Sequence, residues 1–502
     1  MAAVTPQSNP QPRSRKRKRK GLLGRLKDTF DPDRALQTVV GSLIETTSIR
    51  HALDINQEKW EPGKPLKLLL AGYVGTRNTG ADVRVEEMIR QFRHVIGDEN
   101  LQLTICTSDS KLSGGYFRTV DQVQLPQVFP RFLFDECPKH HGVIACEGSM
   151  FKSKFASALT CFMAGALGMA AAENKLSVGY GAEAGGMSPS LQRFVRKHCK
   201  DSLVICRNEP SRGVLGDLGI RTTSGADTAW TFDPGSLDVG KKALMEHGWD
   251  GKKKLLVMCP INPFWWPVTP DLAKAAAMKL GGQFKHEHYK SVYFHHSSDE
   301  SDRKYDAYIQ GMADAVNAFK SRHPDVMVIC AGSEQLDRSS CQALADRIDG
   351  GAPLFISDTY DMYEFVSILR NCTMMVSSRF HAIVTSMPGL VASAGVTMDE
   401  RIRNLMNDRK TPDLFLEVDD KDLGGRLETI LERLYRDREQ LKHTIGQAIP
   451  RQLELMGNMG IHFMDELCSV YPEFPRRDLP RTWQAHLPPL PPTVAGILER
   501  HG

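Results

Sequence analysis

The sequence predicts an α/β protein made of two similar halves, each built around a parallel sheet. Short apolar runs that suit buried strands alternate with helical segments between residues 66 and 206, and the alternation restarts after residue 254. A polar stretch over residues 232–254 separates the two series. Such alternation is typical of strands joined by helices that cover both faces of a sheet. Open α/β sheets bind ligands at the carboxyl ends of their strands, so we expect the site in the cleft between the halves.

The length and composition fit this two-domain organisation. A chain of 502 residues is too long for one ordinary core, and 41% hydrophobic with 25% charged residues excludes disorder of the whole chain. We predict a basic disordered arm and a short helix, an N-terminal domain, a C-terminal domain, and a helical extension that ends in a Pro-rich, disordered or extended tail. The predicted ranges are 1–62, 63–245, 250–425 and 426–502.

The individual elements follow from the apolar runs. Strands are predicted at 66–72, 101–107, 142–146, 176–180 and 203–206, then at 255–260, 291–294, 326–330, 354–356, 374–377 and 390–393. Helices are predicted at 36–49, 83–94, 155–172, 191–199, 307–320, 340–348, 362–370, 380–386 and over 425–468.

One helical stretch, residues 155–172, has no charged side chain over eighteen residues, which is the minimum for a membrane span. It contains two glycines, a serine and a threonine, and it lies directly between two predicted strands. We therefore interpret it as a buried helix packed on a sheet.

Charge is distributed unevenly along the chain. The first 27 residues contain nine Lys or Arg and no acid, whereas the remaining 475 carry 55 basic and 60 acidic side chains. The mildly acidic body argues against a nucleic-acid-binding protein. Eleven cysteines without CxxC pairs, and no secretory signal, favour the reducing cytoplasm. The basic arm has three interpretations: peripheral contact with the inner face of a membrane, a solvated tail, or nuclear import.

Two loops before position 230 have features of anion-binding sites. The loop from Gly72 to Asp82 joins the first strand to its helix, and its glycines let backbone N–H groups approach a ligand near a helix N-terminus. It lacks the G-x-G-x-x-G dinucleotide spacing. Arg207 follows a strand and precedes a Pro-initiated helix, which predicts that it faces the cleft, although a surface salt bridge explains it about as well.

The segment from Met374 to Thr385 is the most informative part of the sequence. A buried strand ends at Ser377 and Ser378, and the next helix begins near Phe380. Arg379 and His381 therefore lie at a helix N-terminus, where an anion is favoured. Arginine offers a planar fork for carboxylate or phosphate, and histidine transfers protons near neutral pH. His295 and His296 show no metal-ligand spacing, and we predict no metal site.

Taken together, these segments resemble the polysaccharide pyruvyl transferase family over roughly residues 66–420. The similarity rests on an ordered set of motifs: Gly-Tyr-x-Gly-x-x-Asn-x-Gly at 72–80, Glu-Gly-Ser at 147–149, Gly-Tyr-Gly at 179–181, Arg-x-Glu-Pro-Ser at 207–211, Gly-Ala-Asp-Thr at 225–228, Ser-Arg-Phe-His at 378–381 and Met-Asp-Glu-Arg-Ile at 398–402. Three features depart from the family pattern: Gly80-Ala-Asp82 replaces Gly-Asp-Glu, only one glycine remains in the second glycine loop, and Arg401 replaces lysine.

The resemblance implies two Rossmann-like domains in a GT-B-like arrangement with the active site in the interdomain cleft. It also implies phosphoenolpyruvate as co-substrate, no other cofactor, and a sugar or lipid-linked glycan as acceptor, converted to a pyruvate ketal. His381 and Arg379 are the expected catalytic residues. The donor is expected to bind Arg207, Ser377, Ser378, Gly72, Gly75 and Asn78.

The base that activates the sugar hydroxyl is left open among four acidic residues, Asp82, Glu147, Glu183 and Glu334. Two other functions remain as alternatives. One is a nucleotide-sugar glycosyltransferase of GT-B type, because one architecture supports several chemistries. The other is a non-catalytic glycan-binding or scaffold protein descended from the family.

Overall fold

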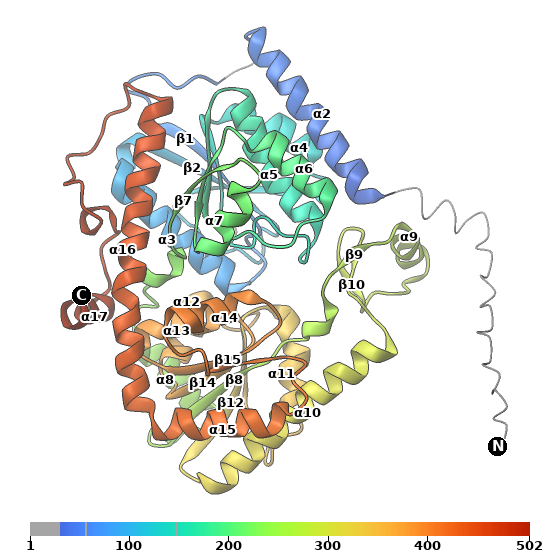
Figure 1. Ribbon diagram of the computed structural model, residues 1–502, viewed down its shortest axis with the longest axis vertical. Helices are drawn as coiled ribbons and strands as arrows, with labels where there is room; N and C mark the ends of the chain where they lie inside the picture. Colours follow the sequence, from blue (N-terminus) through green and yellow to red (C-terminus); the bar gives the residue numbers. More distant parts are fainter. Residues whose placement is uncertain (1–30, 56–57, 147) are drawn as a thin grey trace, which may run out of the picture.

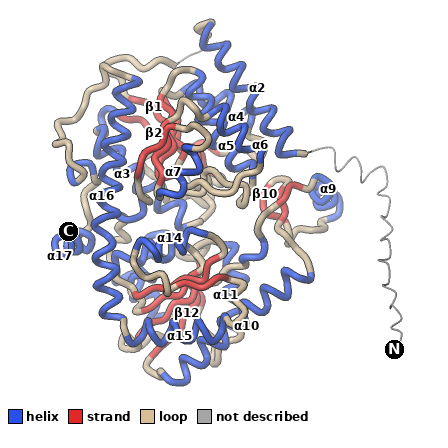
Figure 2. The backbone as a smooth tube through the Cα atoms, in the orientation of Figure 1, coloured by secondary structure: helices blue, strands red, loops and turns tan. Residues whose placement is uncertain are grey.

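The computed structural model describes residues 31–55, 58–146 and 148–502, so the basic arm and Glu147 lie outside the described residues. It contains two parallel sheets, each packed against helices (Figures 1 and 2). The first has the strand order β3-β2-β1-β4-β5-β6-β7, and the second has β13-β12-β8-β14-β15-β16. Renumbered from the first strand of each sheet, both begin 3-2-1-4-5-6, which is the Rossmann order. The predicted fold class, two Rossmann-like domains in a GT-B-like arrangement, is confirmed.

The first sheet and its helices follow the long helix α2. The strands are β1 Leu66–Ala71, β2 Leu101–Thr107, β3 Asp121–Gln124, β4 Gly142–Ala145, β5 Leu176–Ala182, β6 Leu203–Cys206 and β7 Arg221–Ser224. The helices are α2 Pro32–Ala52, α3 Thr79–Ile96, α4 Pro130–Glu136, α5 Ser157–Ala172, α6 Pro189–His198 and α7 Glu209–Gly216.

The second sheet is followed by three helices. Its strands are β8 Lys254–Cys259, β12 Val326–Gly332, β13 Leu354–Ile356, β14 Met374–Ser377, β15 Ala392–Thr397 and β16 Phe415–Glu417. The helices are α8 Leu237–Glu246, α10 Asp299–Arg322, α11 Arg338–Ala345, α12 Met362–Arg370, α13 Phe380–Ser386, α14 Glu400–Asp408, α15 Leu423–Arg436, α16 Arg438–Val470 and α17 Pro492–His501.

The uncharged stretch forms a helix inside the first domain. Helix α5 packs against α2, α6 and β4, and most of its side chains are buried. The sheet and the neighbouring helices cover this helix on all sides. Burial within the protein therefore explains its apolar composition without a membrane. Among the described residues, no helix is long and apolar enough to cross a membrane.

A small insertion corrects one predicted strand. Residues 291–294 were expected in the second parallel sheet, but only Tyr293–Phe294 form a strand, β11, in a separate antiparallel sheet. Its partners are β9 Thr269–Pro270 and β10 His288–Lys290, which flank helix α9 Leu272–Gly281. The insertion lies between β8 and α10 in the chain. Its short strands pair with one another and do not join the second parallel sheet.

The Pro-rich tail is also corrected, because it folds onto the body instead of extending into solvent. Pro492 occupies the first turn of α17, where proline is tolerated, and Val494 and Ile497 are fully buried. Gln91 Nε2 donates a hydrogen bond to the His486 carbonyl at 3.0 Å. Apolar residues between the prolines thus supply contacts that composition alone does not reveal.

Helix α16 connects the two domains. It leaves the second domain after α15 and runs along the first, as Figure 1 shows in orange-red. Met459 packs against Gly225, and the Ala226 N–H lies 3.2 Å from the Met459 sulfur. The helix therefore helps fix the loop after β7 that contributes to the candidate site.

Candidate functional site in the interdomain cleft

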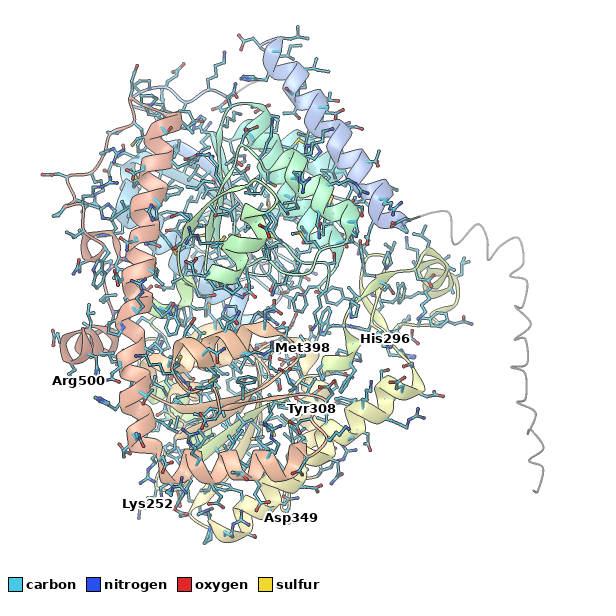
Figure 3. The ribbon with its side chains drawn as sticks, viewed as in Figure 1. Lys252, His296, Tyr308, Asp349, Met398 and Arg500 are labelled. Carbon is cyan, nitrogen blue, oxygen red and sulfur yellow. The ribbon has the colours of Figure 1, made fainter. Side chains whose placement is uncertain are left out.

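A cavity of about 80 Å³ lies between the two sheets. Residues that follow strands of both sheets form much of its wall, namely Tyr73 after β1, Ser149 after β4, Ile261 after β8, Glu334 after β12, Ser378 after β14 and Met398 after β15. Figure 3 labels Met398 beside this cleft. The carboxyl ends of strands from both domains thus surround one polar cavity.

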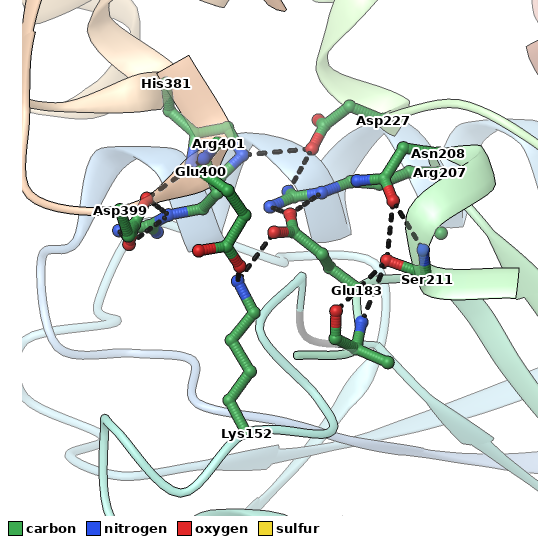
Figure 4. Close-up of polar contacts among 12 residues, drawn as sticks. Lys152, Glu183, Arg207, Asn208, Ser211, Asp227, His381, Asp399, Glu400 and Arg401 are labelled. Atoms are coloured by element: carbon green, nitrogen blue, oxygen red, sulfur yellow. Dashed lines mark hydrogen bonds and ion pairs between the residues drawn. The ribbon is translucent and has the colours of Figure 1, made fainter. Parts of the chain in front are cut away.

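A buried carboxylate, Asp227, lies next to this cavity and links the domains. Its Oδ2 atom is 3.0 Å from Arg84 Nε, 2.9 Å from Arg207 Nη1 and 3.1 Å from His381 Nε2 (Figure 4). Its other oxygen accepts a hydrogen bond from the Ala229 N–H. Burial alone would raise the pKa of Asp227, but Arg84, His381 and Arg207 together hold it well below its usual range. Asp227 is therefore a permanent anion beside the imidazole.

Arg207 belongs to a buried charge network and does not line the 80 Å³ cavity. Its Nε and Nη2 donate to Glu183 Oε2, and its Nη1 donates to Asp227. Lys152 Nζ lies 2.6 Å from both Glu183 Oε1 and Glu400 Oε1, so it joins the first domain to α14 (Figure 4). All three nitrogens of the Arg207 guanidinium are thus engaged by carboxylates.

The imidazole of His381 is held on two sides. Nε2 lies against Asp227, while a Cβ atom added to Gly80 would lie only 2.4 Å from Nδ1. Gly80 is in the first turn of α3, whose N-cap is Asn78. Burial lowers the pKa of His381, and the Asp227 carboxylate opposes this shift. Without an anionic ligand, the neutral imidazole is favoured near pH 7.

Arg379 is bound by two carboxylates of its own domain. Its Nε lies 3.0 Å from Asp337 Oδ2, and its Nη2 contacts Asp337 and, at 2.8 Å, Glu334 Oε2. Burial raises the pKa of both acids, which Arg379 counteracts. Among the described residues, Arg379 Nη1 has no hydrogen-bond partner, so it is available to a ligand in the cavity.

A second arginine of the cavity wall, Arg401, is arranged in the same way. Its Nε and Nη2 bind Asp399, and its guanidinium lies over the Phe155 ring at 4.9 Å. Within the described part of the chain, its Nη1 also has no partner. Both arginines line the cavity, and each has one N–H₂ group without a partner among the described residues.

The first glycine loop is shaped by its own side chains. Gly75 has φ = +75°, a conformation suited to glycine, and its N–H donates to Asp82 Oδ1 at 3.1 Å. Asn78 caps α3 by accepting from Ala81 N–H, and it lines the cavity with Tyr73. Gly72 lines a neighbouring apolar cavity instead, and Asp82 is fully buried.

The two serines before Arg379 have distinct contacts. Ser377 Oγ accepts from the Arg379 N–H and donates to the Arg379 carbonyl, which fixes the turn into α13. Ser378 lines the cavity and shares a 2.8 Å hydrogen bond with Tyr308, labelled in Figure 3. Of the other predicted bases, Glu334 lines the cavity and Glu183 does not.

The sequence predicted no site role for Arg84, Lys152, Asp227 or Asp399. Asp227 was recognisable only as part of a small polar loop, and its partner His381 lies 154 positions away. Lys152 follows the Glu-Gly-Ser motif at 147–149. The comparison of this loop with the family pattern concerned its glycines, so the lysine was not considered. Arg84 was hidden inside a predicted amphipathic helix, yet it is completely buried.

Comparison with family models identifies the central part of the chain. Residues 144–387 match the model of the polysaccharide pyruvyl transferase family. This range includes Arg207, Asp227, Arg379 and His381, and the resemblance inferred from the sequence is confirmed. No curated protein matched the sequence.

Solved structures with similar folds are distant in sequence. A UDP-N-acetylglucosamine 2-epimerase has 10% identity and a TM-score of 0.49, with 84% of this chain and 99% of that chain covered. The Neisseria meningitidis UDP-GlcNAc 2-epimerase bound to UDP-GlcNAc has 10% identity and a TM-score of 0.46, with 80% and 100% covered. Spinosyn rhamnosyltransferase SpnG complexed with thymidine diphosphate has 9% identity and a TM-score of 0.36, with 81% and 96% covered. These values carry no information about substrate.

The contact between Gly80 and His381 predicts an unusual response to alanine. Gly→Ala in a helix ordinarily stabilises a protein by about 0.4–1 kcal/mol. Gly80→Ala would instead force the His381 ring away, and we expect destabilisation of about 1–3 kcal/mol, as for an overpacked core. Urea unfolding of the purified variant measures this difference.

Gly213→Ala is the matched control, because Gly213 is also helical and a Cβ atom there would meet nothing within 4 Å. It should leave stability unchanged or slightly increased. Equal effects of the two substitutions would contradict the tight packing of His381 on α3.

Proposed function

We propose that this protein transfers the pyruvyl group of phosphoenolpyruvate to a sugar of a polysaccharide or glycan precursor, because residues 144–387 match the polysaccharide pyruvyl transferase family model. The product is a ketal that bridges two sugar hydroxyls. The observation that supports this function best is the pairing of His381 with the buried Asp227 at a cavity that two arginines also line.

The reaction requires one carbon protonation and two C–O bond formations. A proton added to the methylene carbon of phosphoenolpyruvate makes the adjacent carbon electrophilic, and a first sugar hydroxyl attacks that carbon. The C–O bond to phosphate then breaks, and a second hydroxyl closes the ketal ring. Of the two hydroxyl protons, one restores the acid that protonated the carbon and the other leaves with the phosphate.

We assign the carbon protonation to His381. Its imidazole lines the cavity and is fixed between Asp227, which holds Nε2, and Gly80 of α3. Burial lowers its pKa in the empty site, and the negative charge of the donor would favour the imidazolium when it is needed. General acid catalysis of this kind contributes about 10²–10⁴-fold to the rate.

Arg379 and Arg401 are the proposed anion-binding residues. Each offers Nη1 at the cavity while its other nitrogens are fixed by carboxylates. Such preorganised donors suit the carboxylate and phosphate of the donor, because they need little rearrangement when charge moves to the leaving group. Arg207 acts one step away, by fixing Asp227 and Glu183. This scheme requires no metal.

Glu334 is the proposed base for the sugar hydroxyl. It lines the cavity, and burial raises its pKa, which brings its proton affinity closer to that needed near neutral pH. Asp82 and Glu183 are engaged in buried contacts away from the cavity wall.

The test is phosphate release from phosphoenolpyruvate with p-nitrophenyl galactoside and p-nitrophenyl N-acetylglucosaminide as acceptors. His381→Ala should lower turnover by about 10²–10⁴-fold, because it removes the general acid. His443→Ala, at an exposed histidine of α16, is the matched control and should retain full turnover. Unchanged turnover in His381→Ala would remove the catalytic assignment. Failure of the native protein to bind phosphoenolpyruvate in a calorimetric titration would overturn the proposed function.

The Asp227 contact predicts a defined pH dependence. If the imidazolium is the active form, kcat/KM falls as pH rises through the pKa of His381 in the free enzyme, which burial lowers from the usual imidazole value. Asp227→Asn removes the carboxylate that raises this pKa, so the fall should move to lower pH. Measuring the profile in both proteins cancels the titration of the donor phosphate, which has a pKa of about 6.

Circular dichroism must show that Asp227→Asn is folded, because the variant leaves two buried arginines with less counter-charge. A purely structural role of Asp227 would lower activity equally at every pH. A profile that keeps its midpoint would therefore contradict the proposed positioning of His381.

A further inference from the structure

A second, apolar cavity adjoins the candidate site. It has a volume of about 420 Å³, within the range of small-molecule pockets, about 300–1,000 Å³. Tyr73, Phe155, Leu159 and Tyr289 line both this cavity and the polar one. The two spaces therefore share a wall, and a ligand that extends past these side chains can occupy both.

The lining of this cavity, which we call the apolar chamber, comes from Gly72 and Tyr73 after β1 and from four further segments. These are the start of α2, the loop 125–130, the beginning of α5, and the hairpin strand β11 with the residues before it. Leu36, Val39, Val128, Phe129, Phe162 and Val292 are among the side chains that face it. The Tyr293 hydroxyl donates to Asp33 Oδ1 at 2.5 Å, which ties the hairpin to α2. A hydrocarbon chain suits such walls, because it needs no hydrogen bonds.

The entrance of the chamber is exposed and apolar. Val39 is 50% exposed and Val128 is 76% exposed, although both line the chamber. Helix α9 begins beside it, because the Asp271 N–H donates to the Val292 carbonyl. Figure 1 shows α9 and the hairpin next to the start of α2. Clustered apolar side chains on a surface mark contact with an apolar partner.

The start of α2 also connects this entrance to the basic sequence. Pro32 lines the chamber, and the nine Lys and Arg of the first 27 residues precede it in the chain. An anionic membrane surface attracts basic segments, so this end of the protein is suited to meet the surface from which a lipid-anchored substrate is presented.

We infer that the apolar chamber binds the hydrocarbon chain of an amphiphilic acceptor whose glycan head lies in the polar cleft, so that the acceptor is a lipid-linked glycan. The inference rests on the proposed function for the identity of the head group. The new element is the binding site for the lipid. The hydrocarbon chain would lie on one side of the shared wall, formed by Tyr73, Phe155, Leu159 and Tyr289, and the reacting sugar on the other.

The test measures binding of octyl, decyl and dodecyl maltoside by calorimetry with the full chain, each below its critical micelle concentration. Burial of each added methylene should tighten binding by up to about fourfold. Ala158→Trp fills the chamber from α5 without lining the polar cavity, and it should weaken dodecyl maltoside binding at least tenfold. Ala495→Trp on α17, far from the chamber, is the matched control and should bind normally.

Val39→Asp gives a second variant at an exposed position, where folding is not at risk, and it should also weaken binding. Binding that ignores chain length, or that is equal in Ala158→Trp and the native protein, would overturn the inference. Binding that appears only after deletion of residues 1–27 would identify that segment as the occupant and would also overturn it.

Phosphoenolpyruvate binding is measured in the same samples. Loss of maltoside binding in Ala158→Trp with donor binding retained supports the lipid site. Absence of donor binding in the native protein contradicts the proposed function and leaves the alkyl-chain result to be judged on its own.

Discussion

The candidate site depends on one buried carboxylate. Asp227, in the loop after β7, contacts Arg84 and Arg207 of the first domain and His381 of the second. All of these groups are largely removed from water, so removing one partner of such a network costs about 3–5 kcal/mol. The same contact holds Nε2 of His381. Asp227 therefore connects the two domains and helps hold the imidazole in one orientation.

The charges around the cleft are paired before any ligand arrives. Three cationic side chains are held by carboxylates in this way. Arg379 pairs with Asp337 and Glu334, Arg401 with Asp399, and Lys152 with Glu183 and Glu400. This pairing avoids the cost of isolated buried charges, and it holds each guanidinium in a fixed direction. The cavity beside these pairs is lined by Arg379 and Arg401, and the apolar chamber adjoins it.

The sequence predicted those features that depend on local pattern. Strands β2, β6, β13 and β14 have the predicted bounds, because short runs rich in apolar residues are typical of strands in parallel sheets. The polar edge strands β3 and β7 gave no such signal, and the tail helix α17 depends on contacts with distant segments. The Arg379–His381 motif was visible from its position after a strand. The pairing of this motif with Asp227 and Asp337 was not predicted, because tertiary contact alone brings these residues together.

The central claim is that a small enol phosphate binds between Arg379, Arg401 and His381. A crystal structure of the protein with phosphoenolpyruvate tests it most directly. We expect the donor's carboxylate or phosphate within hydrogen-bond distance of both Nη1 atoms, with the methylene carbon beside the imidazole of His381. Donor density elsewhere on the protein, or an empty cleft at saturating concentration, would contradict it.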